Sequence, residues 1–255
     1  MIKISGVIIT YNEERYLEKC LQSLVGVVDE IIVVDSFSTD GTKAICEKFD
    51  ATFIEQKFLG YIEQKNFALS KTAFDHVVSL DGDESLSETL QQSIKQLKNN
   101  WVNDGYYANR FNNFCGQWIR HSDWYPNKKL RVFNKNKVSW KGINPHDHIE
   151  LNNTRNKTGH LKGDILHHTY QSYAEYNLKM DQFSTIAAQA YFDRGKRSSL
   201  WKLIWNPFWA FFKAYFLRLG ILDGFNGYMI CYQTGNYTFL KYAKLRELQK
   251  KEKTE

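Results

Sequence analysis

Two aspartates, one residue apart, are the side chains in this sequence best suited to binding a metal ion. Asp81 and Asp83 flank Gly82 and follow the apolar run Val77 to Leu80. Mg²⁺ and Mn²⁺ are hard cations that take one or two protein carboxylates and complete their coordination with water or substrate phosphate oxygens. Such a cation can act as the electrophile that supports a departing diphosphate. The triplet alone also fits a solvated turn, so its surroundings must decide.

The first hundred residues alternate short β-branched runs with segments of helical period, which is typical of a parallel sheet covered by helices. The expected strands are residues 4–10, 31–35, 51–54 and 76–80. The expected helices are residues 14–24, 42–49, 62–71 and 87–97, and Ser85 to Glu88 has a capping-box pattern at the start of the last one. We therefore predict an α/β fold with a Rossmann-like, mostly parallel central sheet flanked by helices.

Polar segments follow three of these strands: Thr10 to Glu13, Asp35 to Thr42, and Asp81 to Glu84. Ligands of open α/β sheets bind beyond the carboxyl ends of the strands, so we expect the three segments to converge on one crevice. The chain has neither G-x-G-x-x-G after the first strand nor a P-loop, so a metal on Asp81 and Asp83 would have to hold phosphate. Asp35 could accept hydrogen bonds from a ribose or base edge, or cap the helix starting near Thr42.

Composition narrows the class of protein. The 255-residue chain is long enough for one substantial core, and its four cysteines lack disulfide or zinc spacing. Its first residues run directly into an apolar strand and leave no room for a signal peptide, so we expect a cytoplasmic protein. The formal charge of +6 indicates an anionic partner, which could be nucleic acid, nucleotide phosphates or an acidic membrane.

Four segments of the first half together resemble the successive motifs of glycosyltransferase family 2. They are Val7 to Glu13, Ile32 to Ser36 with Thr39 to Thr42, Gln64 to Ala68, and Leu80 to Glu84. The second half resembles the lipopolysaccharide core glucosyltransferase subgroup at Trp124 to Pro126, Leu130 to Phe133, Leu166 to His167 and Gly220 to Gly224. The resemblance implies the GT-A fold, nucleotide-sugar donors and inversion at the anomeric carbon.

The resemblance also implies roles for single residues. Those expected to contact the uridine or its ribose are Thr10, Asn12, Glu13, Asp35 and Lys65. Asp83 is the leading metal ligand, and Asp81 would contact either the nucleotide or the metal. His167 matches the position of a further metal ligand, with His168 as the alternative, and a histidine with two carboxylates suits Mn²⁺. Arg131 would neutralise the diphosphate or an acceptor phosphate, unless it is an ordinary surface arginine.

Inverting transfer is a single displacement that needs a carboxylate within hydrogen-bond reach of the attacking hydroxyl. The segment Pro145-His146-Asp147-His148 resembles the family segment that supplies this base, which falls on Asp147. Many relatives carry the longer Glu at that position. His146 and His148 could flank the base, bind metal or form hydrogen bonds within a loop.

The last third of the chain differs in character. Residues 172–194 have the pattern of an amphipathic helix, and residues 241–255 that of a solvated helix. Residues 200–222 are rich in aromatic side chains but contain Lys202, Lys213, Arg218 and Pro207, so this segment is too charged and broken to span a membrane. We predict that it lies on an anionic membrane surface. The alternative is packing against the catalytic domain or a second copy in a homo-oligomer.

Together these observations predict a catalytic domain over residues 1–170, with a nucleotide-binding half at 1–100 and an acceptor half at 101–170. A helical region at 171–255 would contact the membrane or a dimer partner. The expected function is metal-dependent inverting transfer of a hexose, with UDP-glucose the favoured donor, to a lipid-linked saccharide of the inner core of lipopolysaccharide. The enzyme would be peripheral on the inner face of the plasma membrane.

The alternatives are an acceptor from a capsule, a teichoic acid or a protein glycan, a nucleotidyltransferase, and a nucleic-acid-binding module. A nucleotidyltransferase would need a Gly-rich, Arg-containing loop where this chain has Tyr11 to Glu14. The basic residues are dispersed rather than gathered in a recognisable motif, which disfavours nucleic acid as a partner.

Overall fold

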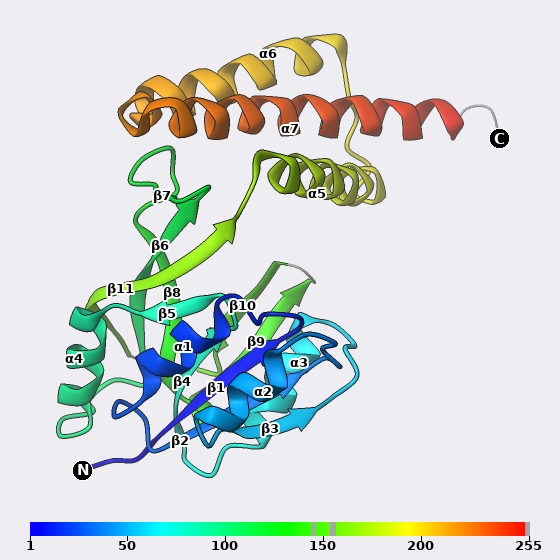
Figure 1. Ribbon diagram of the computed structural model, residues 1–255. Helices are drawn as coiled ribbons and strands as arrows, with labels where there is room; N and C mark the ends of the chain where they lie inside the picture. Colours follow the sequence, from blue (N-terminus) through cyan, green and yellow to red (C-terminus); the bar gives the residue numbers. More distant parts are fainter. Residues whose placement is uncertain (144–145, 154–156, 253–255) are drawn as a thin grey trace. The chain divides into compact units, whose positions relative to one another are not determined.

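The chain folds as two compact units in a computed structural model that describes residues 1–143, 146–153 and 157–252 (Figure 1). The first unit comprises residues 1–110 and 127–168, and the second comprises residues 111–126 and 169–255. The predicted functional division at residue 170 stays a prediction.

The central sheet has the strand order β3-β2-β1-β4-β8-β6-β11-β5, with β7 paired to β6. Its strands are β1 (Ile4–Thr10), β2 (Glu30–Asp35), β3 (Thr52–Glu55), β4 (His76–Asp81), β5 (Glu84–Leu86), β6 (Gly105–Phe114), β7 (Gln117–Trp118), β8 (Asn127–Asn134) and β11 (Thr158–Tyr170). The first four strands along the order are parallel. From β8 onward the sheet is antiparallel in the pairs β4–β8, β6–β8 and β5–β11. A separate antiparallel pair is formed by β9 (Val138–Ile143) and β10 (His146–Leu151).

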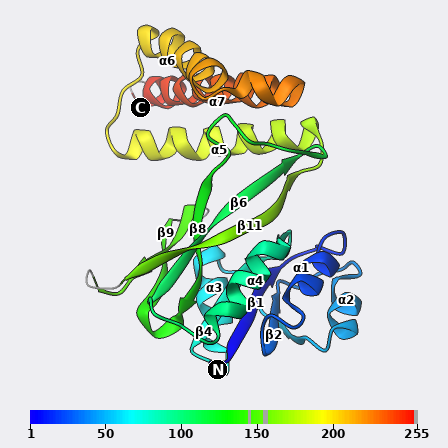
Figure 2. The ribbon, with the colours of Figure 1, turned by 90° about the vertical axis from the view of Figure 1, so that its left-hand side faces the viewer.

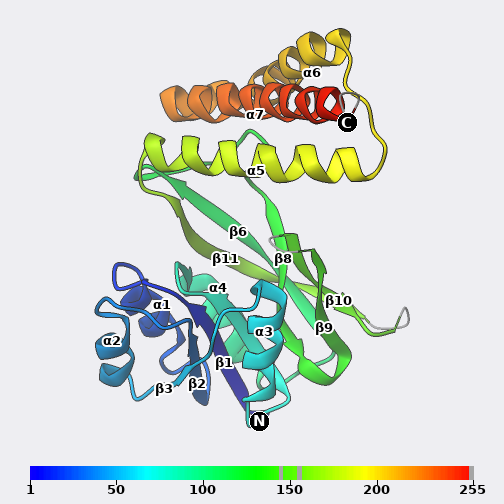
Figure 3. The same ribbon diagram turned by 90° about the vertical axis from the view of Figure 1, so that its right-hand side faces the viewer.

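Two layers cover the parallel part of the sheet, because successive side chains of a strand point to opposite faces. Ile4 and Ile8 of β1 pack with α1 (Leu17–Leu24), α2 (Thr42–Lys48) and α4 (Glu88–Leu97). Val7 and Ile9 pack with α3 (Tyr61–Ser70) and with β9 on the other face. The views in Figures 2 and 3 are taken from opposite sides, with α4 toward the viewer in the first and α3 in the second.

The predicted α/β fold class is confirmed, and the predicted strands and helices of the first hundred residues are present. Two local expectations were wrong. The helix predicted from residue 14 begins at Leu17, because residues 14–16 form a turn. The capping box does not start at Ser85, which lies in β5; instead Ser87 caps α4, its hydroxyl accepting a hydrogen bond from the Leu90 amide at 3.3 Å.

The second unit contains three long helices, α5 (Tyr173–Asp193), α6 (Leu200–Phe212) and α7 (Gly224–Lys251). The hydroxyls of Ser172 and Ser199 cap α5 and α6. Pro207 lies inside α6, and the rest of the aromatic segment continues as a π-helical turn at Lys213–Leu217 and a 3₁₀ turn at Gly220–Asp223. Within the described residues, no helix has both the length and the apolar character needed to cross a membrane.

Candidate active site

The carboxyl ends of three neighbouring strands bring the predicted polar segments together. In the ladder between β1 and β2, Thr10 lies opposite Asp35, and in the ladder between β1 and β4, Ile9 lies opposite Asp81. Gly82 permits close packing of these ends, since a Cβ added there would come within 3.0 Å of the Thr10 hydroxyl oxygen. The DGD segment therefore packs directly against the end of β1, and the first and fourth motifs form one surface.

Asp81 is held between two buried cations. Arg131 Nη2 lies 2.8 Å from Oδ2 of Asp81, and Lys65 Nζ lies 3.0 Å from Oδ1. Burial alone would raise the pKa of Asp81, but Arg131 and Lys65 hold that pKa well below its usual range. Asp81 is therefore ionised throughout the physiological pH range, with both oxygens engaged by protein cations.

Arg131 is 4% exposed, so the interpretation of this residue as a surface arginine was wrong. Besides Asp81 it contacts Glu84, whose Oε1 lies 3.1 Å from Arg131 Nη2, and Arg110 approaches the same oxygen at 3.5 Å. Burial opposes the charged guanidinium, yet the two carboxylates raise the pKa of Arg131 above its ordinary value. Its Nη1 is buried and has no hydrogen-bond partner among the described residues, which leaves donor capacity on this side chain.

Lys65 links Asp81 to the predicted base. Its ammonium donates a hydrogen bond to Asp147 Oδ2 at 2.8 Å and lies over the Trp140 ring, 4.4 Å from the centroid. Asp147 lies in β10 opposite Gly142 of β9, and the Asn66 side chain donates to the Trp140 carbonyl at 3.1 Å. The β9–β10 hairpin thus carries Asp147 to the α3 lysine, across 82 residues of sequence.

Asp83 and His167 face each other on neighbouring segments. His167 Nε2 lies 3.3 Å from Asp83 Oδ2, and the pairing of β11 with β5 brings His167 opposite Glu84. His168, the alternative ligand, is stacked on Tyr16 at 4.2 Å between ring centroids. Burial lowers the pKa of His168 below its ordinary value.

The donor set of Asp83 and His167 fits Mg²⁺ or Mn²⁺, since one carboxylate and one imidazole leave positions for water and phosphate oxygens. Within residues 1–143, 146–153 and 157–252, no three His, Cys, Asp or Glu side chains are gathered as a complete protein cage. A cation here would therefore depend on oxygens from a bound substrate.

The loops after β1 and β2 are joined by hydrogen bonds between them. Asn12, in a left-handed conformation with φ of 53°, accepts from the Thr39 amide at 2.8 Å, and the Glu13 amide donates to the Thr42 hydroxyl at 3.0 Å. Asp35 is fully buried and accepts from the amide and hydroxyl of Ser38. The expected alternative that Asp35 caps the helix near Thr42 was wrong.

Gly41 is the N-cap of α2, and Asp40 before it accepts from the Thr42 amide at 3.0 Å. The buried hydroxyl of Thr10 has no hydrogen-bond partner among the described residues. That hydroxyl lies at the same edge of the sheet as the hydrogen-bonded Asn12 and Glu13 loop.

Two histidines, His146 and His148, lie on either side of Asp147 in the sequence. His148 is exposed and its ring lies 3.0 Å from Glu150 Oε1, away from the cation network. The side chain of His146 falls outside the described part of the chain.

Sequence reasoning missed the central position of Glu84, which is 1% exposed. The signal in the sequence was an acidic residue directly after the DGD triplet and before a serine-rich helix start.

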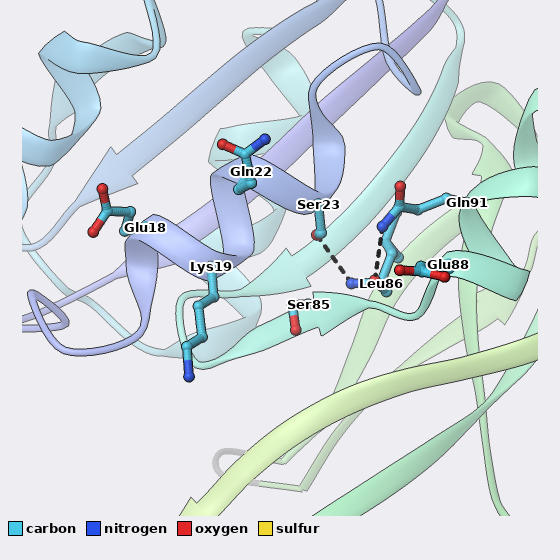
Figure 4. Close-up of a pocket in the computed structure, with 8 residues that line it drawn as sticks. All are labelled: Glu18, Lys19, Gln22, Ser23, Ser85, Leu86, Glu88 and Gln91. Carbon is cyan, nitrogen blue, oxygen red and sulfur yellow. Dashed lines mark hydrogen bonds between the residues drawn. The ribbon is translucent and has the colours of Figure 1, made fainter.

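A cavity of about 560 Å³ opens elsewhere in the first unit, between α1, β5 and the start of α4 (Figure 4). Its rim is fixed by Leu86, whose amide donates to Ser23 Oγ at 3.0 Å and whose carbonyl accepts from Gln91 at 3.1 Å. None of the predicted site residues lines it. The candidate site is therefore the ion-paired cluster at the strand ends and not this cavity.

Comparisons with known proteins give a consistent result. The family model for glycosyl transferase family 2 matches residues 5–159. An uncharacterized glycosyltransferase of Rickettsia felis is 33% identical, covering 97% of this chain and 90% of its own length. The lipopolysaccharide core biosynthesis glycosyltransferase LpsC of Rhizobium meliloti is 30% identical, covering 96% of this chain and 92% of its own length. Among solved structures, S. aureus TarS 1-349 in complex with UDP matches 98% of this chain and 92% of its own, with 17% identity and a TM-score of 0.48.

Proposed function

Because the chain belongs to glycosyl transferase family 2, we propose that it is an inverting hexosyltransferase that uses a UDP-sugar donor. UDP-glucose is the favoured donor. The proposed acceptor is a lipid-linked saccharide, the inner core of lipopolysaccharide, and the similarity to LpsC over nearly the whole chain supports this choice. The second candidate is the same reaction on a saccharide of a capsule, a teichoic acid or a protein glycan.

The observation that carries this proposal is the position of the Lys65 ammonium between two carboxylates. Lys65 Nζ is 3.0 Å from Oδ1 of Asp81, the proposed nucleotide contact, and 2.8 Å from Oδ2 of Asp147, the proposed base. A displacement reaction needs its leaving-group site and its base on opposite sides of one reacting carbon, a few ångströms apart. A single buried side chain that contacts both carboxylates fixes that separation.

On the donor side, Asp83 and His167 would hold Mg²⁺ or Mn²⁺, with Asp81 as a nucleotide contact or as a ligand once its cations shift. When bound, this ion neutralises charge that develops on the diphosphate. Lys65 and Arg131 would add positive charge to the same region. The proposed uridine and ribose contacts are Thr10, Asn12, Glu13, Asp35 and Lys65.

On the acceptor side, Asp147 would accept the proton of the attacking hydroxyl. The bond between the acceptor oxygen and the anomeric carbon forms as the bond to the diphosphate oxygen breaks, and the hydroxyl proton moves to Asp147. The Lys65 ammonium holds Asp147 Oδ2 and so orients the carboxylate toward the reacting centre. Attack opposite the leaving group inverts the anomeric configuration.

The helical region would keep the enzyme at its substrate. Aromatic side chains of α6 are exposed, among them Trp201, Trp205 and Phe208, and such residues lie at headgroup depth in peripheral membrane proteins. We therefore propose a cytoplasmic enzyme, peripheral on the inner face of the plasma membrane. A homo-oligomer that covers the same residues is the competing arrangement.

Release of UDP from a panel of UDP-sugars tests this proposal, with and without purified lipid-linked core saccharide. We expect UDP-glucose with the lipopolysaccharide acceptor to give the fastest release. Turnover only with a teichoic acid or glycoprotein acceptor would move the assignment to the second candidate. Failure of every UDP-sugar to be consumed would contradict the proposed donor class.

A further inference from the structure

A cationic pocket lies in the second unit, where α5 is connected to α6. It has a volume of about 360 Å³. The lining residues come from three elements and their connection: Tyr191 of α5, Lys196 and Arg197 of the connecting segment, Lys202 in the first turn of α6, and Tyr242 of α7. None of them belongs to the candidate active site.

The charge in this pocket is mostly uncompensated. Lys196 Nζ lies over the Tyr191 ring, 4.3 Å from its centroid, and Lys202 Nζ donates to the Arg197 carbonyl at 3.0 Å. Arg197 is paired with Glu252. In the part of the chain that the structure describes, neither lysine has a carboxylate partner, and aromatic faces and a backbone carbonyl are weak counterions. The pocket thus offers two ammonium groups to an anion.

Lys202 also belongs to a helix whose outer face is apolar. Trp201 and Ile204 are each 70% exposed, and the Trp201 ring stacks on Trp205 at 5.6 Å. Residues three and four apart share one side of a helix, so these three and Phe208 form a stripe. Soluble monomers seldom expose apolar groups so closely spaced, and such a stripe usually marks a membrane or protein contact.

We propose that the pocket binds the phosphate of an anionic lipid headgroup while the α6 stripe enters the bilayer interface. Ammonium and guanidinium groups donate charge-assisted hydrogen bonds to phosphate oxygens, and aromatic rings settle at the depth of the headgroups. The lysines and the stripe begin at the same end of α6, so one anionic bilayer surface could contact both of them. This site rests on the proposed function and specifies which residues would attach the enzyme to the membrane. Binding of the protein to vesicles tests it without any measurement of sugar transfer.

The experiment is co-sedimentation of the full-length protein with vesicles of phosphatidylglycerol and phosphatidylcholine in equal parts, or of phosphatidylcholine alone, without any UDP-sugar. Each basic residue at an anionic membrane surface contributes about a factor of five to binding. We expect Lys196→Gln/Lys202→Gln to lower partitioning onto the anionic vesicles by roughly 30-fold, and Lys196→Arg/Lys202→Arg to retain it. The matched control, Lys48→Gln/Lys95→Gln, removes the same charge from the first unit and should change partitioning by less than about threefold.

Equal loss in the pocket variant and the control would overturn the site, because attraction would then depend on net charge alone. Sedimentation velocity tests whether a second copy of the chain covers α6 instead of a membrane. If no vesicle composition binds and Trp201→Ser/Trp205→Ser converts a dimer to a monomer, a second copy covers α6 and the proposal is wrong. Thermal melting and UDP binding of each variant verify folding. If Lys196→Gln/Lys202→Gln loses vesicle binding but still transfers sugar to a soluble acceptor, the membrane site and the proposed reaction are distinguished.

Discussion

Replacing Arg131 by Met should destabilise the first unit strongly, because it removes one cation from a buried cluster. Arg131 is 4% exposed and contacts both Asp81 and Glu84. Removing one member of a buried ion pair typically costs about 3–5 kcal/mol. Here Asp81 keeps Lys65 at 3.0 Å and Glu84 keeps Arg110 at 3.5 Å, so we expect the lower end, about 3 kcal/mol.

The same substitution should alter the response to acid. Arg131 and Lys65 overcome burial and hold the pKa of Asp81 well below its unfolded value of about 3.9. A carboxylate with a depressed folded pKa contributes stability above its unfolded pKa, and this is lost as pH falls toward the folded pKa. In Arg131→Met the pKa of Asp81 is higher than in the wild type, so acid removes less stability from the variant than from the wild type. The difference in free energy of unfolding between the two proteins should therefore narrow below about pH 4.

Urea unfolding followed by far-UV circular dichroism and tryptophan fluorescence measures both effects. The Arg131 guanidinium lies 5.4 Å from the Trp140 ring, and this ring is one of the seven tryptophans that contribute to the fluorescence. Thermal melting should fall by roughly 6–12 °C, since about 1 kcal/mol shifts a domain of this size by about 2–4 °C. The exposed Arg15 supplies the control Arg15→Met, expected within about 0.5 kcal/mol of the wild type. A loss under about 1 kcal/mol, or one that is constant from pH 7 to pH 3, would refute the reasoning.

Three further predictions concern the site and the membrane. Excess EDTA should abolish turnover, and Asp83→Asn should weaken UDP binding and the rate together, measured by calorimetry and UDP release; full activity in EDTA would exclude the metal. Asp147→Asn should bind UDP-sugar normally but transfer roughly 10²-fold more slowly or worse, because proton removal occurs only in the transition state; a normal rate would assign the base elsewhere. Trp201→Ser/Trp205→Ser should reduce binding to anionic vesicles without loss of UDP binding, whereas unchanged vesicle binding would assign these rings another role.

Local patterns predicted the first four strands because each is a short β-branched run ending in polar residues. The antiparallel strands were not predicted, since β8 and β11 carry lysines, asparagines, histidines and glycines and lack a continuous apolar run. Such strands are specified by pairing with neighbours distant in sequence, which a local window does not contain.

The same limit applies to the site. The order of the motifs predicted that Asp35, Asp81 and Asp83 lie at one edge of the sheet. No sequence pattern relates Lys65 to Asp147, because only the folded β9–β10 hairpin brings these two residues into contact. The burial of Arg131 likewise depends on its ion pairs with Asp81 of β4 and Glu84 of β5, which only the fold brings to β8. A lone arginine in a polar stretch resembles a surface residue until these partners are in position.

The anomeric configuration of the transferred sugar tests the central claim most directly. Proton NMR of the product formed from UDP-glucose, an α-linked donor, and purified core saccharide identifies the new linkage. A single displacement with Asp147 as base predicts a β-linked glucose on the acceptor, and this signal should form roughly 10²-fold more slowly or worse with Asp147→Asn. An α-linked product, or UDP release without sugar on the acceptor, would contradict the account.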